Sequence, residues 1–113
     1  MEIHINIDCR DPNALADFYC AALGYVPEGE AGEQYRSIRA NDGRPKIVFQ
    51  RVPEAKAVKN RMHLDLIVGP EIEEEAERWV ALGASRIERV EEFGLNWIVM
   101  ADPEGNELCI CDA

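Results

Sequence analysis

The chain has 113 residues, of which 47% are apolar and 30% charged, so we expect one folded domain with a single core rather than a disordered chain. Its formal net charge of −10 repels phosphate backbones and acidic lipid surfaces, which argues against nucleic acid and membrane as partners. There is no secretion signal and no apolar run of about 20 residues, so we expect a cytoplasmic protein whose four cysteines are reduced.

The first half of the chain begins with a predicted strand over residues 2–9, where apolar and polar residues alternate. Asp11 and Pro12 then form a helix start, and Gly24 is the expected C-cap of that helix. A weak strand is predicted near Pro27, in a stretch rich in turn residues. Two clearer strands follow at 34–40 and 46–52, joined by an Asn-Asp-Gly turn at 41–43.

The second half repeats this order after a connection at 53–61 that has no apolar period. A strand over 63–68 precedes an amphipathic helix that Pro70 and Glu71 open and Gly83 ends. Strands are then predicted at 84–91, 96–101 and 107–112, with an Asp-Pro-Glu-Gly-Asn turn at 102–106.

The two halves align without gaps at several positions that are 59 residues apart. His4 matches His63, the triplet 22–24 matches 81–83, and Gln50 matches Cys109. A repeat of this length indicates a duplicated supersecondary unit. We therefore predict an α+β fold in one domain, 1–113, made of two βαβββ repeats at about 1–52 and 62–113.

Strand alternation predicts which side chains face away from the helices. If the apolar residues of each first strand, from Ile3 and from Leu64 onward, pack under the helices, the polar ones share the other face. The strands that end the halves add Gln50 and Cys109 to that face. The resulting group of candidate ligand and site residues is His4, Asn6, Asp8, Gln50, His63, Asp65 and Cys109.

A metal site is one interpretation of this group, because neutral imidazole is the commonest transition-metal ligand and the two histidines occupy matched positions. The alternative is that each histidine is a hydrogen-bonded structural residue. Asp8 or Asp65 could hold the second imidazole nitrogen, or could instead pair with Arg61 or Lys59.

Basic residues concentrate in one stretch of this acidic chain. Residues 36–61 hold eight of the twelve basic side chains and only two acids, which gives +6. The stretch is either a solvated surface or the wall of a site for an anionic ligand, with Arg51, Lys59 and Arg61 as the candidate contacts. Trp97 and Phe93 either line a site for an aromatic ligand or fill the core.

Five segments together resemble the vicinal oxygen chelate superfamily, and within it the small glyoxalase-like proteins related to glyoxalases, bleomycin-resistance proteins and extradiol dioxygenases. The resemblance covers essentially the whole chain. The matching segments are His4 with Asp11-Pro12 seven residues later, the helix end at 21–25, and the runs 49–53, 59–66 and 101–107.

This resemblance implies an incomplete barrel or cup with helices outside and a divalent metal, such as zinc, nickel, manganese or iron, held by the first and last strands of each half. Those positions are His4, Gln50, His63 and Cys109 here, with Glu107 as a shifted alternative ligand. Glyoxalases of the family usually carry carboxylates at the two last-strand positions. This chain carries none there, and the dioxygenase set of two histidines and a carboxylate is also incomplete.

Three functions remain open at this point. The cup binds a small organic ligand beside a degenerate site without metal, or it holds a metal for a lyase, isomerase or dioxygenase reaction, or it is filled and serves association. Cys109 is a nucleophile activated by the imidazoles or simply a small buried apolar residue. A homodimer is expected, because an incomplete barrel leaves strand edges to cover.

Overall fold

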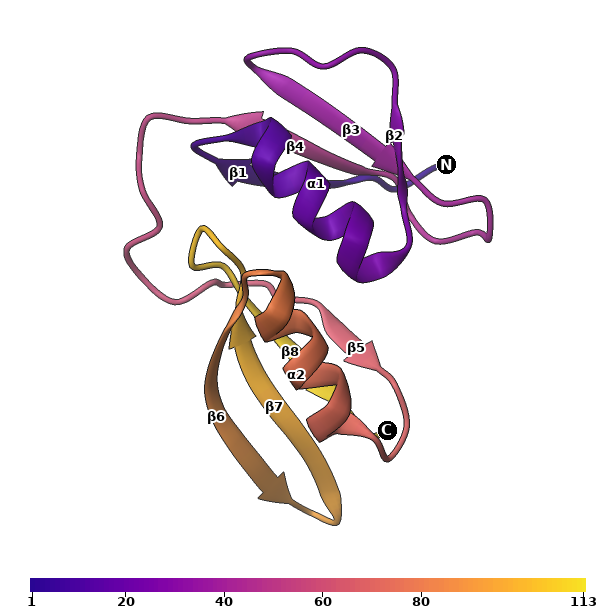
Figure 1. Cartoon of the computed structure of the whole chain (residues 1–113), viewed down its shortest axis with the longest axis vertical. Helices are drawn as coiled ribbons and strands as arrows, with labels where there is room; N and C mark the ends of the chain where they lie inside the picture. The colour runs from indigo at the N-terminus through magenta and orange to yellow at the C-terminus, as the bar shows by residue number, and fades with distance from the viewer. The chain divides into compact units, whose positions relative to one another are not determined.

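The computed structural model describes residues 1–113 as two compact units, Met1–Lys56 (unit 1) and Ala57–Ala113 (unit 2). Each unit has one helix and four strands in the order β-α-β-β-β (Figure 1). This confirms the predicted α+β class and the duplicated unit. The boundary between the units falls inside the predicted connection at 53–61.

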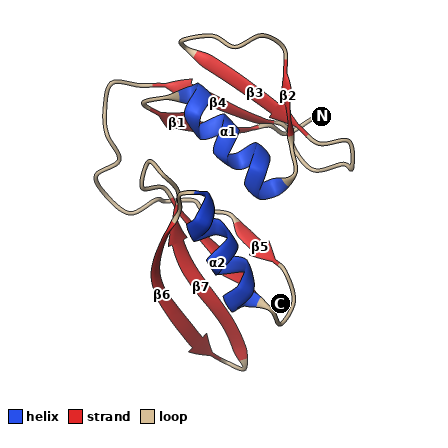
Figure 2. Ribbon diagram, viewed as in Figure 1, coloured by secondary structure: helices blue, strands red, loops and turns tan.

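Unit 1 is a mixed four-stranded sheet with a helix across one face (Figure 2). Its strand order is β1-β4-β3-β2, in which β1 runs parallel to β4 and the other neighbours are antiparallel. The elements are β1 (Ile5–Cys9), α1 (Pro12–Leu23), β2 (Val26–Glu28), β3 (Tyr35–Arg39) and β4 (Ile47–Arg51).

The predicted caps of α1 are confirmed. The Asp11 Oδ1 atom accepts a hydrogen bond from the backbone N–H of Ala14 at 3.1 Å, and Pro12 is the first helical residue. Gly24 ends the helix with a φ of 72°, a left-handed conformation that favours glycine. Between the caps, the Tyr19 ring stacks on Phe49 of β4 with ring centroids 5.5 Å apart, which fixes α1 on its sheet.

Unit 2 has the same topology, with strand order β5-β8-β7-β6 and β5 parallel to β8. Its helix buries Ile72, Ala76 and Trp79, which recur at helical spacing. Neither helix of the chain is long and apolar enough to cross a membrane. The elements are β5 (Asp65–Ile67), α2 (Ile72–Leu82), β6 (Ser85–Glu92), β7 (Leu95–Ala101) and β8 (Glu107–Cys111).

The first strand of each unit is shorter than predicted. β1 begins at Ile5 and β5 at Asp65, so both histidines precede their strands. Ile3, expected under the helix, is 70% exposed, and Val68 is 38% exposed. Both strands are sheet edges with one neighbour each, so their ends lack the partners that would extend and bury them.

The two parallel strand pairs differ in register. Asn6 lies opposite Val48 in unit 1, and Asp65 lies opposite Cys109 in unit 2. Asn6 and Asp65 are 59 positions apart, whereas their partners Val48 and Cys109 are 61 apart. Gln50 therefore faces the same side as its sequence match Cys109 but lies two residues further along its strand pair.

Candidate metal centre

The face of the unit 2 sheet away from α2, here called the open face, is set by alternation along β8. Leu108 and Ile110 are fully buried on the α2 side. Glu107, Cys109 and Cys111 consequently point to the open face.

Neighbouring strands supply the rest of the open face at fixed positions. Cys109 lies between Asp65 of β5 and Val99 of β7. Cys111 lies between Ile67 and Trp97 in the same way. The open face thus has two adjacent rows across the strands. One row contains the charged Asp65 beside Cys109 and Val99, and the other is formed by Ile67, Cys111 and Trp97.

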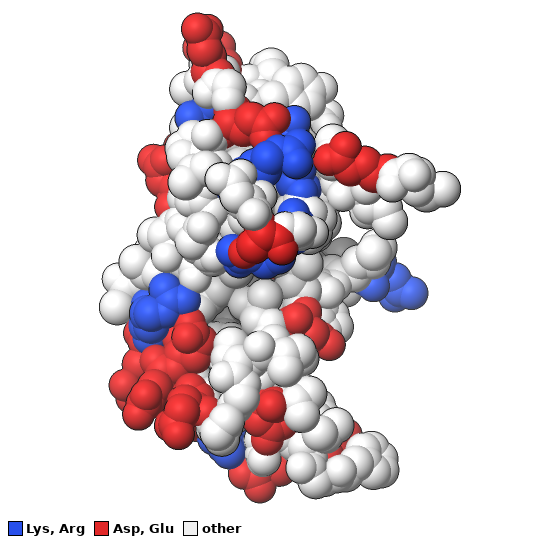
Figure 3. Space-filling view, turned by 90° about the vertical axis from the view of Figure 1, so that its right-hand side faces the viewer, with Lys and Arg blue, Asp and Glu red and all other residues white.

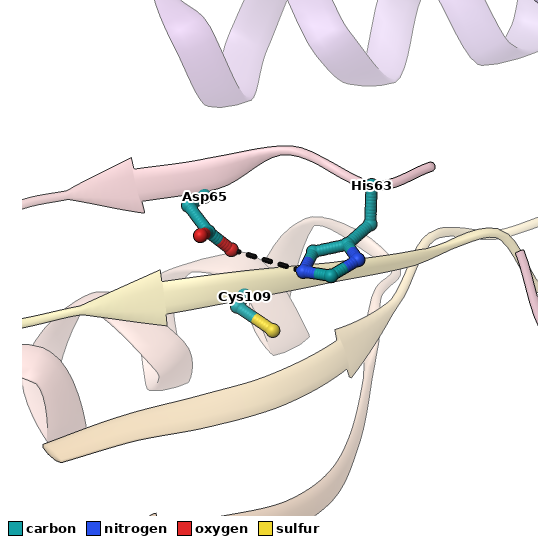
Figure 4. A group of neighbouring side chains, drawn as sticks. All are labelled: His63, Asp65 and Cys109. Atoms are coloured by element: carbon teal, nitrogen blue, oxygen red, sulfur yellow. Dashed lines mark ion pairs between the residues drawn. The ribbon is translucent and has the colours of Figure 1, made fainter. Parts of the chain in front are cut away.

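His63, Asp65 and Cys109 form one compact group on the open face (Figure 4). Their ligand atoms, one each of nitrogen, oxygen and sulfur, all lie within 4.8 Å of one another. The His63 Nε2 atom is 3.1 Å from Asp65 Oδ1. Asp65 thus pairs with the His63 imidazole and forms no ion pair with Arg61 or Lys59. That it orients a metal-bound imidazole stays a prediction.

The electrostatics of Cys109 favour a neutral thiol in the absence of a cation. Burial raises the pKa of Cys109 above its ordinary value, and the neighbouring Asp65 carboxylate raises this pKa further, while Lys59 opposes the shift. The structure therefore favours the interpretation of Cys109 as a buried apolar residue over an activated nucleophile. A bound divalent cation would invert this balance, because it stabilises the thiolate directly.

The donor set and spacing of this group fit a zinc-type ion. Two nitrogen or oxygen ligands at about 2.0 Å from a tetrahedral zinc lie about 3.3 Å apart. The His63 to Asp65 distance of 3.1 Å is already close to that value. The Cys109 sulfur lies within 4.8 Å of the other two ligand atoms.

His4 and Gln50, the two candidates in unit 1, have partners inside their own unit. His4 Nε2 lies 3.0 Å from Glu2 Oε1, and Glu2 also pairs with Arg39. Gln50 Oε1 accepts a hydrogen bond from Asn6 Nδ2 at 3.3 Å. The site that His4 and His63 were expected to share stays a prediction.

Two further carboxylates of the predicted site are not members of the group, Asp8 of unit 1 and Glu107 of unit 2. Asp8 lies opposite Gln50 and is exposed. Glu107 accepts a hydrogen bond from the backbone N–H of Asn60 at 3.0 Å through its Oε2 atom. Glu107 thus anchors the segment that leads into His63, a positioning contact that no pattern in the sequence predicts.

The predicted anion contacts are exposed side chains without ion pairs. Arg51, Lys59 and Arg61 have no acidic partner. Ion pairs are formed, in contrast, by Arg39, Arg44, Lys46, Arg78, Arg86 and Arg89. Lys59 lies close enough to Cys109 to affect its pKa. Unit 2 holds 13 acidic and five basic residues, a net charge of −8, and acidic side chains gather over its surface (Figure 3).

The two predicted aromatic candidates have different surroundings. Trp97 is half-buried on the open face, opposite Cys111 on one side and Val90 on the other. Phe93 is 97% exposed at the tip of the β6–β7 hairpin, so within unit 2 it neither fills the core nor lines the open face. Trp97 is therefore the aromatic residue available to a ligand there.

Comparison with known families gives a match over residues 4–111 to the glyoxalase-like domain. The chain belongs to this family. The match spans both units. No curated protein matches the chain.

Solved structures with this fold include a glyoxalase/bleomycin resistance protein/dioxygenase family enzyme from Burkholderia phytofirmans PsJN, with 22% identity, a TM-score of 0.78 and coverage of 96% of this chain and 94% of that one. A mutant fosfomycin resistance protein from Listeria monocytogenes, in complex with Mn(II) and 1S,2S-dihydroxypropylphosphonic acid, has 15% identity, a TM-score of 0.80 and coverage of 97% and 87%. Lactoylglutathione lyase from Agrobacterium tumefaciens has 16% identity, a TM-score of 0.71 and coverage of 98% and 92%. At these identities the likeness establishes the fold.

Proposed function

We propose that this glyoxalase-like protein binds a small organic ligand on the open face of unit 2, beside a divalent metal held by His63, Asp65 and Cys109. The observation that carries the proposal is the approach of three different donor atoms to within 4.8 Å of one another. A thiolate in the set favours zinc over manganese or magnesium, because soft ligands select soft or borderline ions. When bound, such an ion acts as a Lewis acid toward a ligand oxygen.

The chain's own residues would orient the ligand. Trp97, Val99 and Ile67 supply apolar surface next to the metal group. Lys59 and Arg61, which precede His63 and have no ion-pair partner, would attract an anionic ligand group. The solved relative in complex with Mn(II) and 1S,2S-dihydroxypropylphosphonic acid supports a ligand of this type, since its fold is the same.

Binding without metal is the second candidate. It is favoured by Gln50, which replaces a carboxylate expected of glyoxalases and is already hydrogen-bonded to Asn6. In that case the open face would still bind the ligand, and His63 would serve only as a hydrogen-bond donor paired with Asp65.

The decisive experiment is a zinc titration of chelator-stripped, tag-free protein against a chromogenic competitor. The wild-type chain should bind one ion. His63→Ala, Asp65→Asn and Cys109→Ser should each weaken binding at least about tenfold, since even the loss of a residue that only hydrogen-bonds to a metal ligand costs roughly 10–100-fold. Cys20→Ser, which changes a thiol on α1 in unit 1, is the matched control and should bind like wild type.

The titration also separates the remaining alternatives. If wild type binds zinc no better than the His63→Ala variant, the metal proposal fails and the metal-free candidate takes its place. Weaker binding by His4→Ala would show that unit 1 contributes a ligand, as the family resemblance implies. Unchanged binding would show that the unit 2 group is sufficient.

A homodimer completes the proposal. Each sheet has two open edges, and β6 in unit 2 is an eight-residue edge strand, which is long for an unpaired edge. Association through such an edge would satisfy its free backbone groups. Sedimentation equilibrium should give twice the mass of the 12.7 kDa chain, and a monomer at micromolar concentration would contradict this part of the proposal.

A further inference from the structure

A second candidate site lies wholly in unit 1, at the carboxyl end of the parallel β1–β4 pair. A hollow of about 450 Å³ opens there, lined by Arg10, Asp11, Gln34, Arg51, Val52 and Pro53. This volume lies in the range of small-ligand pockets, roughly 300–1,000 Å³. None of the metal-group residues takes part in it.

The rim of the hollow is held by backbone hydrogen bonds. Arg51 is opposite Cys9 in the last position of the strand pair, and the Val52 N–H donates to the Cys9 carbonyl at 2.8 Å. The Arg51 N–H donates to the carbonyl of Gln34 at 2.8 Å. These hydrogen bonds connect three segments of the backbone. The backbone positions of the residues that line the hollow are therefore well defined.

The charge in the hollow favours an anion. Two guanidinium groups, of Arg10 and Arg51, and the amide of Gln34 line it, and Arg51 has no ion-pair partner. Asp11 is the acid there, so two guanidinium groups and one carboxylate give the hollow a formal charge of +1, and Asp11 Oδ1 accepts the N-cap hydrogen bond from the Ala14 N–H. A positive hollow stands out on a chain with a net charge of −10.

We propose that this hollow binds a small oxyanion, a phosphate or a carboxylate group, between the guanidinium groups of Arg10 and Arg51. Guanidinium groups bind both groups through paired N–H···O hydrogen bonds. Val52 and Pro53 offer apolar surface for a short carbon skeleton attached to the anion. The ligand is therefore a small organic phosphate or carboxylate.

The test is calorimetric titration of the full chain with inorganic phosphate and, separately, with succinate. Saturable binding of either probe is expected, with an affinity that falls as salt rises. Arg51→Gln and Arg10→Gln should each weaken binding by about tenfold, the loss expected for one charge-assisted contact. The better probe of the two identifies which oxyanion the hollow takes.

Arg44→Gln is the matched control, because it removes an arginine of unit 1 outside the hollow, and it should bind like wild type. Far-UV circular dichroism checks that every variant is folded. The proposal is overturned if neither probe binds saturably, or if Arg51→Gln and Arg10→Gln bind as well as the control. Protein treated with chelator should give the same result, so the outcome does not depend on the metal site in unit 2.

Discussion

Asp65 and Cys109 lie directly opposite each other in the parallel β5–β8 pair, and this relationship governs the chemistry of the open face. Burial raises the pKa of the Cys109 thiol and the Asp65 carboxylate raises it further, while the same carboxylate lies 3.1 Å from the His63 imidazole. One acidic residue thus contributes to the raised pKa of a thiol and pairs with an imidazole.

The first prediction concerns the reactivity of Cys109. Asp65→Asn removes a negative charge beside the thiol, so it should lower the Cys109 pKa and speed alkylation by iodoacetamide in mildly alkaline buffer. Peptide mass spectrometry of metal-free protein measures the rate at each cysteine. Cys20 on α1 is the internal control, and an equal acceleration there would point to general loosening instead.

Cys111 makes a prediction about alkaline stability. Burial, and then the nearby Asp65 charge, raise the pKa of Cys111 to about 11 from an ordinary 9.0. A group whose pKa is higher in the folded state contributes stability that is present below pH 9 and is lost as pH rises toward 11. The free energy of unfolding from urea titrations should fall across that window, and fall less in Cys111→Ala.

Glu73 on α2 should control acid stability. Hydrogen bonds from Arg86 and Arg89 lower the pKa of Glu73 from 4.5 to about 2. A depressed carboxyl pKa contributes stability that is present above pH 4.5 and is lost as pH falls toward 2. Glu73→Gln should therefore flatten the loss of stability in this range.

The acid effect can be checked against salt and a neighbouring residue. All three side chains are solvent-accessible, so added salt should reduce the difference between wild type and Glu73→Gln. Glu74→Gln, one position along the helix and without an ion pair, is the control. An equal change in both variants would assign the effect to net charge.

Asp102 should be the most sensitive polar residue of unit 2. It is 3% exposed and accepts hydrogen bonds from the N–H groups of Glu104 and Asn106 and from the Asn106 amide. Asp102→Ala leaves these donors unpaired and should cost about 2–3 kcal/mol in urea unfolding. Asp102→Asn keeps one acceptor oxygen and should lose less.

Phe93 offers a stabilising substitution. It has a φ of 54° and Gly94 a φ of 77°, between the paired residues Glu92 and Leu95, which is a two-residue hairpin with both central residues left-handed. Asn-Gly is the preferred sequence for such a turn. Phe93→Asn should raise the free energy of unfolding by about 1 kcal/mol, whereas Phe93→Ala, which keeps the strain, should not.

Much of the fold could be predicted from the order of helix-capping residues and of segments in which apolar and polar residues alternate. Asp11-Pro12 and Gly24 bound α1 as expected, because cap residues act over one turn and need no tertiary partner. The repeat at 59 residues gave the second unit the same topology. Strand ends were less predictable, since Ile3 and Val68 depend on neighbours that edge strands lack.

The residues of the candidate site could be predicted from the sequence, but the contacts among them could not. Alternation placed His63, Asp65 and Cys109 on one face. It could not show that Asp65 would be the closest partner of His63, or that Glu107 would be engaged by Asn60. Those contacts depend on the register of β5 against β8 and on the path of the preceding loop, which no local pattern encodes.

Because the β1–β4 and β5–β8 pairs differ in register by two residues, the sequence repeat does not identify positions with equivalent neighbours in the two units. A carboxylate introduced by Gln50→Glu would lie opposite Asp8, whereas Cys109→Glu would lie opposite Asp65, the residue matched to Asn6. Paired substitutions chosen from the sequence repeat would thus compare chemically different surroundings. Substitutions in each unit therefore have to be chosen from the cross-strand partners of that unit, and not from the matching position in the other unit.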